Sequence, residues 1–108
     1  MYRVKHKVPA KGNYAESEIR KTRPAVIVSN DAANRHLSRA VVVPITGNAD
    51  RQYPGEALVT IADKRGKAMA DQIMAADKIR LKTQLASLTK SDMLAVENAI
   101  LVHLGMPK

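Results

Sequence analysis

The 108-residue sequence predicts a mainly β protein of the α+β class, in which a small, strongly bent antiparallel sheet or partly open barrel precedes one amphipathic helix. Short alternating or β-branched runs recur along the chain, with turn residues between them. From Leu88 onward the apolar period changes from two to about 3.6. The length suits one hydrophobic core, so we expect a single domain over residues 1–108.

Six strands are expected from these runs. They cover residues 2–8, 24–29, 40–45, 56–61, 67–74 and 78–85. The second and third (PAVIVS and AVVVPI) are continuous apolar runs, which is typical of strands buried on both faces. Pro44 lies within the third run and has no backbone N–H to donate, so it predicts a sheet edge or a bulge.

The intervening segments are predicted to be turns and loops. Residues 10–22 are polar and have no sustained apolar period, which indicates a long exposed loop between the first two strands. Residues 46–55 (TGNADRQYPG) are loop-forming throughout, and residues 62–66 predict a turn. Asn30 and Asp31 are expected to open a turn or a short helix.

Residues 88–104 predict a helix that packs on the sheet. Its apolar stripe is formed by Met93, Val96, Ile100 and Leu104, and is widened by Leu94 and Leu101. Thr89 can cap the first turn, with Asp92 three residues on as the acid of a shortened capping box. Gly105, followed by Pro107, ends the helix.

The composition excludes several classes of protein. There is no Cys, so disulfide frameworks and thiolate metal sites are excluded, and no oxidising compartment is needed. Phe and Trp are also missing, so the core must be aliphatic. The N-terminal residues lack the apolar segment of a signal peptide, and no stretch is long and apolar enough to span a membrane. We therefore expect a soluble cytoplasmic protein.

The charge indicates a polyanionic partner. The formal net charge is +8, and the first 40 residues carry nine Lys or Arg against three acidic residues. A cation that neutralises a phosphate releases condensed counterions, so a surface of this kind favours nucleic acid. Charge that serves only solubility on solvated faces is the alternative.

Arg23 is the strongest candidate for chemistry. It precedes Pro24, which restricts Arg23 to an extended backbone and so directs the guanidinium off the end of a buried strand. A guanidinium can hold two phosphate oxygens and stabilise the additional charge of a pentacovalent transition state. Alternatively, Arg23 forms a surface ion pair with Glu18 that is worth about 1 kcal/mol or less.

Thr46 and the pair Asp71-Gln72 are further candidates. The Thr46 hydroxyl lies where a loop leaves a strand and can donate to a phosphate oxygen, although Thr also commonly starts turns. Asp71 and Gln72 can contact a base edge or position a sugar hydroxyl. The structural alternative is that Asp71 is buried within a strand and accepts hydrogen bonds from backbone donors.

Aromatic and histidine side chains complete the candidates. Tyr14 and Tyr53 lie in the two loops beside the basic segment, where their rings can stack on unpaired bases or anchor the loops. His6, His36 and His103 share no metal-ligand spacing, so no metal site is expected. His6 is the best placed of the three for acid-base chemistry because it lies in the basic first strand.

Several of these segments together resemble the MazF/PemK family of toxin endoribonucleases. The matching segments are RPAVIVSND (residues 23–31), VVVPIT (41–46), Tyr53-Pro54 with Glu56, and ADQI (70–73) after Gly66. They occur in the family's order, and the similarity runs over nearly the whole chain.

This resemblance implies an SH3-like barrel, the fold shared with plasmid-maintenance gyrase poisons, and a homodimer with an RNA groove across it. It implies sequence-specific cleavage of single-stranded mRNA by attack of a ribose 2′-hydroxyl on the adjacent phosphate, which leaves a 2′,3′-cyclic phosphate and a 5′-hydroxyl. No metal or other cofactor is implied. The implied partner is a cognate antitoxin, a short acidic and partly disordered segment that folds over the groove.

The resemblance also assigns roles to residues. Arg23 would be the main transition-state stabiliser, Thr46 would hold the scissile phosphate, and Glu18 would orient Arg23 or assist as base. The RNA-binding candidates are Tyr14, Arg20, Lys21, Asn48, Arg51, Tyr53, Asp71 and Gln72. Ser17 and Met69 stand where some relatives carry His and Arg, so the acid-base residues of those relatives are missing from this chain.

Two other functions are compatible with the same fold. A non-catalytic gyrase poison would act through the terminal helix and residues 105–108, with no need of Arg23 or Thr46. An RNA-binding module without nuclease activity would share the basic groove. The basic N-terminal third and the RP and PIT segments favour RNA over gyrase.

Overall fold

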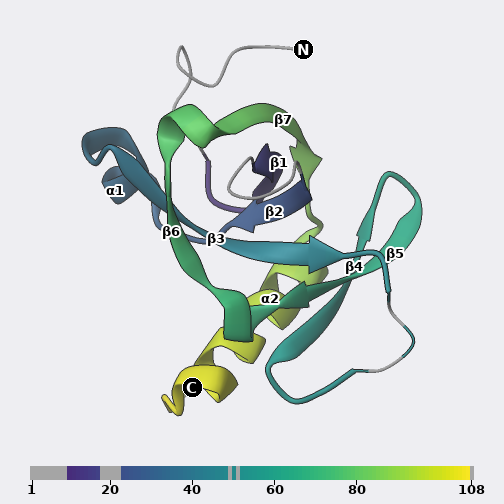
Figure 1. Ribbon diagram of the computed structural model, residues 1–108. Coiled ribbons are helices and arrows are strands. Elements are labelled where there is room, and N and C mark those ends of the chain that lie inside the picture. The colour runs from purple at the N-terminus through teal and green to yellow at the C-terminus, as the bar shows by residue number, and fades with distance from the viewer. Residues whose placement is uncertain (1–9, 18–22, 49, 51, 108) are drawn as a thin grey trace.

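A strongly bent antiparallel sheet forms most of the molecule, and a long helix packs against one side of it (Figure 1). The computed structural model describes residues 10–17, 23–48, 50 and 52–107. Its strands are β1 (Asn13–Ser17), β2 (Arg23–Ile27), β3 (Arg39–Thr46), β4 (Glu56–Ile61), β5 (Lys64–Met69), β6 (Met74–Asp77) and β7 (Leu81–Ser87). Its helices are α1 (Asp31–His36), α2 (Lys90–Leu104) and the short 3-10 helices η2 (Ala70–Gln72) and η3 (Lys78–Arg80). The sheet is bent and not closed, and the mainly β fold with a C-terminal helix is confirmed.

β3 is the central strand of the sheet. The strand order is β4-β5-β3-β2-β1-β7, and β6 pairs with β3 outside this path. β2 pairs along one edge of β3, whereas β6 and β5 share the other edge, over residues 39–42 and residues 45 and 46 respectively. β3 therefore links the hairpin of β4 and β5 to the rest of the sheet.

Pro44 lies in this central strand, so the prediction of a sheet edge is wrong. The carbonyl of Val41 accepts a hydrogen bond from the N–H of Val28 at 2.9 Å, so the backbone groups of Val41 face β2. Backbone directions alternate along a strand, so the nitrogen of Pro44 faces the other edge. There it falls between the residues paired with β6 and those paired with β5. An interior strand can therefore hold this proline without losing a ladder bond.

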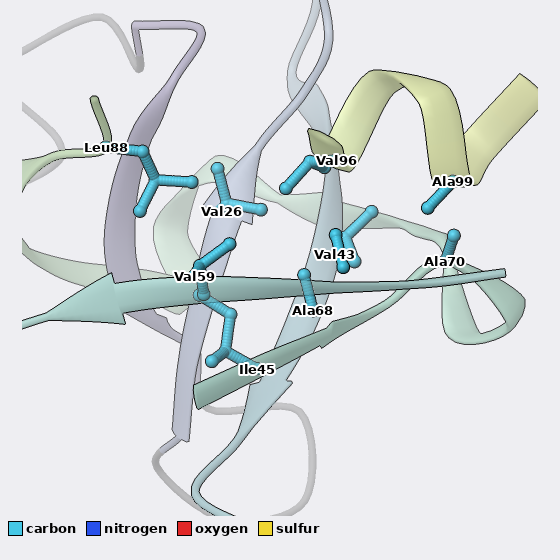
Figure 2. Close-up of a cluster of buried hydrophobic side chains, with 10 residues drawn as sticks. Val26, Val43, Ile45, Val59, Ala68, Ala70, Leu88, Val96 and Ala99 are labelled. Atoms are coloured by element: carbon cyan, nitrogen blue, oxygen red, sulfur yellow. The ribbon is translucent and has the colours of Figure 1, made fainter. Parts of the chain in front are cut away.

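Apolar residues are buried on both faces of the sheet. The larger cluster lies between the sheet and α2 and contains Val26, Val43, Ile45, Ala57, Val59, Ala68, Ala70, Leu88, Val96 and Ala99 (Figure 2). The smaller cluster contains Ala25, Ile27, Ala40, Val42, Ala76 and Leu81. Successive residues of β2 and β3 alternate between the two clusters, which confirms that both strands are buried on both faces. The core residues of both clusters are aliphatic, as predicted.

A polar motif fixes the connection between β2 and β3. Asn30 accepts the N–H of Ala33 at 2.8 Å and so caps α1, which confirms the short helix predicted here. Asn34 is fully buried, and its Nδ2 donates to the carbonyl of Ser29 at 2.8 Å. The Ser29 hydroxyl donates to Asn34 Oδ1, and its oxygen accepts the N–H of Val41 at 2.9 Å. These bonds tie the end of β2 to β3 and help to set the register between the two strands.

Residues 10–22 do not form one long loop. β1 lies within them and pairs antiparallel with β2 along one edge and with β7 along the other. Its sequence, NYAES, shows no strand periodicity, but the strand is paired along both edges, with breaks in its register against β7. The strand predicted over residues 2–8 lies outside the described residues.

The strands after β4 differ from the prediction: β5 begins earlier than expected, and 3-10 helices interrupt the later strands. Ala62 and Asp63 form a two-residue turn with φ of 48° and 62°, so β5 starts at Lys64. β5 ends at Met69, where η2 separates it from β6. The strand predicted over residues 67–74 is therefore divided in two, and η3 similarly delays the start of β7.

α2 has the predicted caps. Thr89 Oγ1 accepts the N–H of Asp92 at 3.1 Å, and Gly105, with φ of 68°, ends the helix. The carboxylate of Asp92 also accepts the N–H of Thr60 at 2.9 Å, which ties the first turn of α2 to β4. In the described part of the chain, no helix is both long and apolar enough to cross a membrane.

The buried face of α2 is narrower than predicted. The residues that contact the larger cluster are Met93, Ala95, Val96, Ala99 and Ile100. Leu94 and Leu104, which the sequence placed on or beside the stripe, are 66% and 52% exposed. Ala99, which the apolar stripe omitted, is buried instead because a small residue allows the helix to approach the sheet closely.

Candidate active site

Three polar side chains that are far apart in the sequence lie on one row across the sheet. Ala25 of β2 pairs with Pro44 of β3, and this register, continued by two residues, places Arg23 opposite Thr46. On its other edge, Thr46 pairs with Lys67 of β5. Directly opposite residues of antiparallel strands point to the same face of a sheet. Arg23, Thr46 and Lys67 therefore form one polar row, on the face away from α2.

Arg23 opens this row at the first position of β2. Its backbone is extended and pairs with Ser17 of β1, as the following Pro24 predicts. The side chain is exposed, so the guanidinium can reach a ligand in solvent. The guanidinium carries positive charge and a planar fork of donors suited to a phosphate. The alternative partner, Glu18, lies outside the described residues.

Thr46 ends β3 and also starts the turn that follows. Its Oγ1 accepts the N–H of Asn48 at 3.3 Å, and Asn48 Oδ1 in turn accepts the N–H of Asp50 at 3.2 Å. The turn-forming role considered from the sequence is therefore present. It uses one lone pair of the hydroxyl oxygen and leaves the hydroxyl proton for a second partner. A phosphate oxygen beside Arg23 is such a partner.

Lys67 and Glu56 form a buried ion pair that the sequence did not reveal. Lys67 Nζ lies 3.3 Å from Glu56 Oε1, and the two side chains are only 10% and 14% exposed. The same Glu56 oxygen accepts the N–H of Tyr53 at 2.8 Å. Lys67 Nζ also lies 5.7 Å from the centroid of the Tyr53 ring. The pair therefore connects the polar row to the loop before β4.

Tyr53 and Asn48, both predicted to bind RNA, lie beside this row. Tyr53 is 53% exposed and contacts Lys67, the neighbour of Thr46. Asn48 is exposed and bonded to Thr46. Exposed Arg65 lies two positions before Lys67 and therefore on the same face of β5, where it adds positive charge.

Asp71 and Gln72 lie elsewhere. Both are exposed and belong to η2, so the buried strand position considered for Asp71 is wrong: the chain leaves the sheet after Met69. Gln72 Nε2 contacts the Met69 sulfur at 3.5 Å. The N–H of Ala70 donates to the carbonyl of Gly55 at 2.9 Å, which places η2 next to the end of the loop rather than at Thr46.

Several predicted site residues lie outside the described part of the structure. Those outside the described residues are Glu18, Arg20, Lys21, Arg51 and His6. The backbone of Tyr14 lies in β1 opposite Val26, but its ring is outside the described part of the structure. His36 and His103 are exposed at the last turns of α1 and α2. Over the described ranges, no three His, Cys, Asp or Glu side chains gather closely enough to hold a metal ion.

The row supplies the groups needed to bind and activate a phosphodiester. One permanent cation and one hydroxyl donor face the same space, and a partly exposed aromatic ring lies beside them. Charge neutralisation and hydrogen bonding to phosphate oxygens are the main contributions a protein makes to phosphoryl chemistry. An aromatic ring suits an unpaired base.

The chain matches a family of toxins and is similar to curated proteins. The model for the PemK-like, MazF-like toxin of type II toxin-antitoxin systems matches residues 8–104. The endoribonuclease MazF9 of Mycobacterium tuberculosis is 35% identical in a match that covers 91% of this chain and 87% of that protein.

Solved structures resemble the fold closely. An endoribonuclease from a mycobacterial species has a TM-score of 0.84 at 29% identity, covering 94% of this chain and 96% of that one. A mycobacterial endoribonuclease in complex with its cognate antitoxin gives a TM-score of 0.84 at 29% identity, covering 93% and 98%. A MazE-MazF structure from Deinococcus radiodurans gives 0.80 at 27% identity, covering 94% and 99%. The chain therefore belongs to the PemK-like, MazF-like family of toxins of type II toxin-antitoxin systems.

Proposed function

We propose that this MazF-type endoribonuclease toxin cleaves single-stranded mRNA at a short sequence motif, without a metal ion, through Arg23 and Thr46. The observation that carries the proposal is the register of β2 and β3: Arg23 and Thr46 each lie two residues beyond the pair Ala25 and Pro44, at the same end of the two strands and on the same face of the sheet. Because the arginine side chain is long, both side chains can reach the same phosphate from these positions. The relatives named as endoribonucleases support this activity over gyrase poisoning.

The reaction needs little from the protein because the nucleophile belongs to the substrate. The ribose 2′-oxygen bonds to the adjacent phosphorus and gives up its proton, while the bond from phosphorus to the 5′-oxygen breaks and that oxygen takes a proton. The products are a 2′,3′-cyclic phosphate and a 5′-hydroxyl. Because attack is intramolecular, orientation, two proton transfers and charge neutralisation suffice.

Arg23 and Thr46 divide this work. The Arg23 guanidinium neutralises the extra charge on the pentacovalent phosphate and donates hydrogen bonds to its oxygens, while water can supply the proton that the leaving oxygen takes. The Thr46 hydroxyl donates to a non-bridging oxygen and so holds the phosphate beside Arg23. Glu18 would orient Arg23 or accept the proton of the 2′-hydroxyl, a role that stays a prediction because Glu18 is outside the described residues.

The RNA would continue from the phosphate over the neighbouring loop. Tyr53 offers a half-exposed ring for stacking, and Asn48 an exposed amide for base edges. Asp71 and Gln72 are exposed on η2 beside the end of the same loop, where a longer RNA would pass. Contacts from Tyr14, Arg20, Lys21 and Arg51 stay predictions.

Two protein partners belong to the proposal. The toxin would be held inactive in the cytoplasm by a cognate antitoxin, since one similar solved structure is a complex with its cognate antitoxin. An acidic antitoxin segment would compete with RNA for the positive face around Arg23. A homodimer is supported by apolar side chains that α2 and the residues after it leave exposed, namely Leu94, Val102, Leu104 and Met106.

The test is cleavage of a long single-stranded RNA in excess EDTA, with Arg23→Ala beside the unchanged protein. We expect discrete cuts with cyclic phosphate ends, and a rate at least about 100-fold lower for Arg23→Ala, comparable to losing one transition-state donor. Arg35→Ala, which changes an exposed arginine of α1, is the matched control and should cleave normally. Cleavage that requires added metal, or that survives in Arg23→Ala, would contradict the proposal. Intact RNA from a folded protein would redirect the work to gyrase inhibition.

A further inference from the structure

We propose that Glu56 and Lys67 are positioning residues that hold Tyr53 as a preformed stacking platform for an unpaired RNA base, and that this platform selects the base next to the cleaved phosphate. The inference rests on the proposed ribonuclease function and extends it to specificity. It assigns a role to an ion pair that the chemistry at Arg23 and Thr46 does not use.

The burial of this ion pair is the first argument. The Lys67 and Glu56 side chains are 10% and 14% exposed, although both lie on the face of the sheet that also carries exposed residues. Removing two charges from water costs about as much as their attraction returns, so apolar residues at such positions are often equally stable. Stability alone therefore does not explain why a lysine and a glutamate occupy these positions.

The contacts of the pair supply an explanation. Glu56 Oε1 lies 3.3 Å from Lys67 Nζ and accepts a hydrogen bond from the N–H of Tyr53 at 2.8 Å. Lys67 Nζ lies 5.7 Å from the centre of the Tyr53 ring, within the range of a cation–π contact. One member of the pair thus fixes the backbone of Tyr53 and the other fixes its ring. Two further bonds, from Glu56 N–H to the Tyr53 carbonyl at 3.0 Å and from Gln52 Nε2 to the Glu56 carbonyl at 3.1 Å, close the turn.

The exposure of Tyr53 shows what is being held. A tyrosine that served only as a loop anchor would bury its ring, since an aromatic ring stabilises through the area it removes from water. Tyr53 is 53% exposed despite its fixed backbone. A ring that is held in place and still exposed to solvent suits stacking on a base. The entropy cost of ordering the ring is met on folding and not on RNA binding.

The position of the platform relates it to cleavage. Lys67 is directly opposite Thr46 in the sheet and also contacts the Tyr53 ring. A single side chain therefore separates the platform from the hydroxyl proposed to hold the scissile phosphate. A base stacked on Tyr53 belongs to a nucleotide beside the cleaved bond, where a stacking preference becomes a cleavage preference.

A double-mutant cycle tests this role. Tyr53→Ala, Glu56→Gln and their combination are compared in cleavage of an RNA pool randomised around the cut site. We expect each single variant to lower kcat/KM on the preferred RNA by about tenfold, as for loss of one base stack, and to weaken the preference at one flanking base. In the Tyr53→Ala background, Glu56→Gln should have almost no further effect, because it acts through Tyr53. Tyr53→Phe, which keeps the ring, should keep the base preference that Tyr53→Ala loses.

The controls separate positioning from charge and from folding. Asp63→Asn, an acid-to-amide change at the exposed turn after β4, is matched to Glu56→Gln and should change nothing. Because Glu56→Gln leaves Lys67 buried without its carboxylate, the charge-neutral variant Glu56→Gln/Lys67→Met is measured beside it, with thermal unfolding of each. The salt dependence of RNA binding by this double variant should equal that of the unchanged protein. A slope smaller by about 0.7 would show that Lys67 instead neutralises a phosphate.

A binding measurement keeps the inference distinct from the ribonuclease proposal. The probe is a non-cleavable single-stranded oligonucleotide with 2-aminopurine at successive positions, whose fluorescence is quenched by stacking. Quenching at one position that is lost in Tyr53→Ala and weakened in Glu56→Gln supports the platform, even if the protein cleaves no RNA. Equal quenching in all variants would overturn the inference, whether or not RNA is cleaved. If RNA is cleaved, additive effects in the cycle or an unchanged base preference in Tyr53→Ala would also overturn it.

Discussion

The two connections of β4 are built in opposite ways. After β4, the chain turns in two exposed residues, Ala62 and Asp63, whose positive φ angles match the twist of the hairpin. Before β4, residues 47–55 form a longer loop whose ends are fixed by side chains. Thr46 bonds to the first part of this loop, and Glu56 with Gln52 fixes the last part.

This difference shows where the fold constrains its sequence for reasons other than stability. A two-residue turn is specified by backbone geometry, so its residues need only tolerate positive φ and make no particular side-chain contact. The longer loop depends on particular side chains, including a buried ion pair that apolar residues could replace at little cost in stability. Thr46 and Tyr53, the proposed phosphate and base contacts, lie at the two ends of this loop. The need to hold these two residues in place therefore explains the side-chain contacts of the loop.

Among substitutions in the two connections of β4, the largest effect is expected at Thr46. Thr46→Val keeps the branched side chain but removes the proton donor to the phosphate, so cleavage should fall by about 100-fold or more. The exposed turn bond to Asn48 is lost as well, which should lower the free energy of unfolding by only about 0.5–1 kcal/mol. Thr60→Val, the same change in β4, is the control, measured by cleavage rate and urea unfolding. Equal cleavage by both variants would remove Thr46 from the active site.

A smaller effect, on stability, is expected from a substitution at Gly66, where β5 contacts the end of β3. A Cβ on Gly66 would lie 3.0 Å from Ile45 Cγ2 and 3.2 Å from the carbonyl oxygen of Thr46. Gly66→Ala should therefore push β5 from β3 and lower the free energy of unfolding by about 1–3 kcal/mol, as for other overpacked sites. Gly47→Ala is the matched control, because nothing lies within 4 Å of its added Cβ. If urea unfolding shows the same loss for both, close approach at Gly66 is not the cause.

The smallest effect, and the only gain, is expected at the hairpin. Ala62→Asn combined with Asp63→Gly gives the residues that favour positive φ at both turn positions. This should raise the free energy of unfolding by about 1 kcal/mol, since left-handed backbone is unfavourable for most residues. Thermal unfolding checks the gain, and RNA cleavage should remain unchanged. A change in cleavage rate would mean that the two ends of β4 are coupled.

Much of the fold could be predicted from local pattern. The apolar runs at β2 and β3, the alternation at β4 and the caps of α2 are local signals, and each element formed where expected. β1 was missed because its five residues show no apolar periodicity and depend on pairing with two neighbouring strands. The end of the helical stripe was wrong because exposure of Leu104 depends on how far the sheet extends beneath α2.

In the candidate site, too, some residues could be predicted from the sequence and others could not. Arg23 and Thr46 could be proposed from their places at strand ends, and the register of β2 and β3 puts both at the same end of the two strands and on the same face. Lys67 and Glu56 had no comparable signal: each is an ordinary charged residue in an alternating strand until pairing brings Lys67 beside both Thr46 and Tyr53. Asp71 was misplaced because an apolar run does not show where a strand gives way to a 3-10 turn.

The pairing of β1 with β7 bears on how fast the molecule forms. The side-chain bond between Asn13 and Ser87 joins residues 74 positions apart, and Leu88 donates its N–H to Gly12 beside it. Contacts this distant must overcome a large loop-closure entropy before they stabilise anything, which places such sheets among the slower folders, in about the millisecond to second range. β2 and β3 are joined by only α1 and can meet early, but β2 keeps an open edge until β1 and β7 arrive. We therefore expect β2 and β3, the strands that carry Arg23 and Thr46, to pair before β1 and β7 complete the sheet.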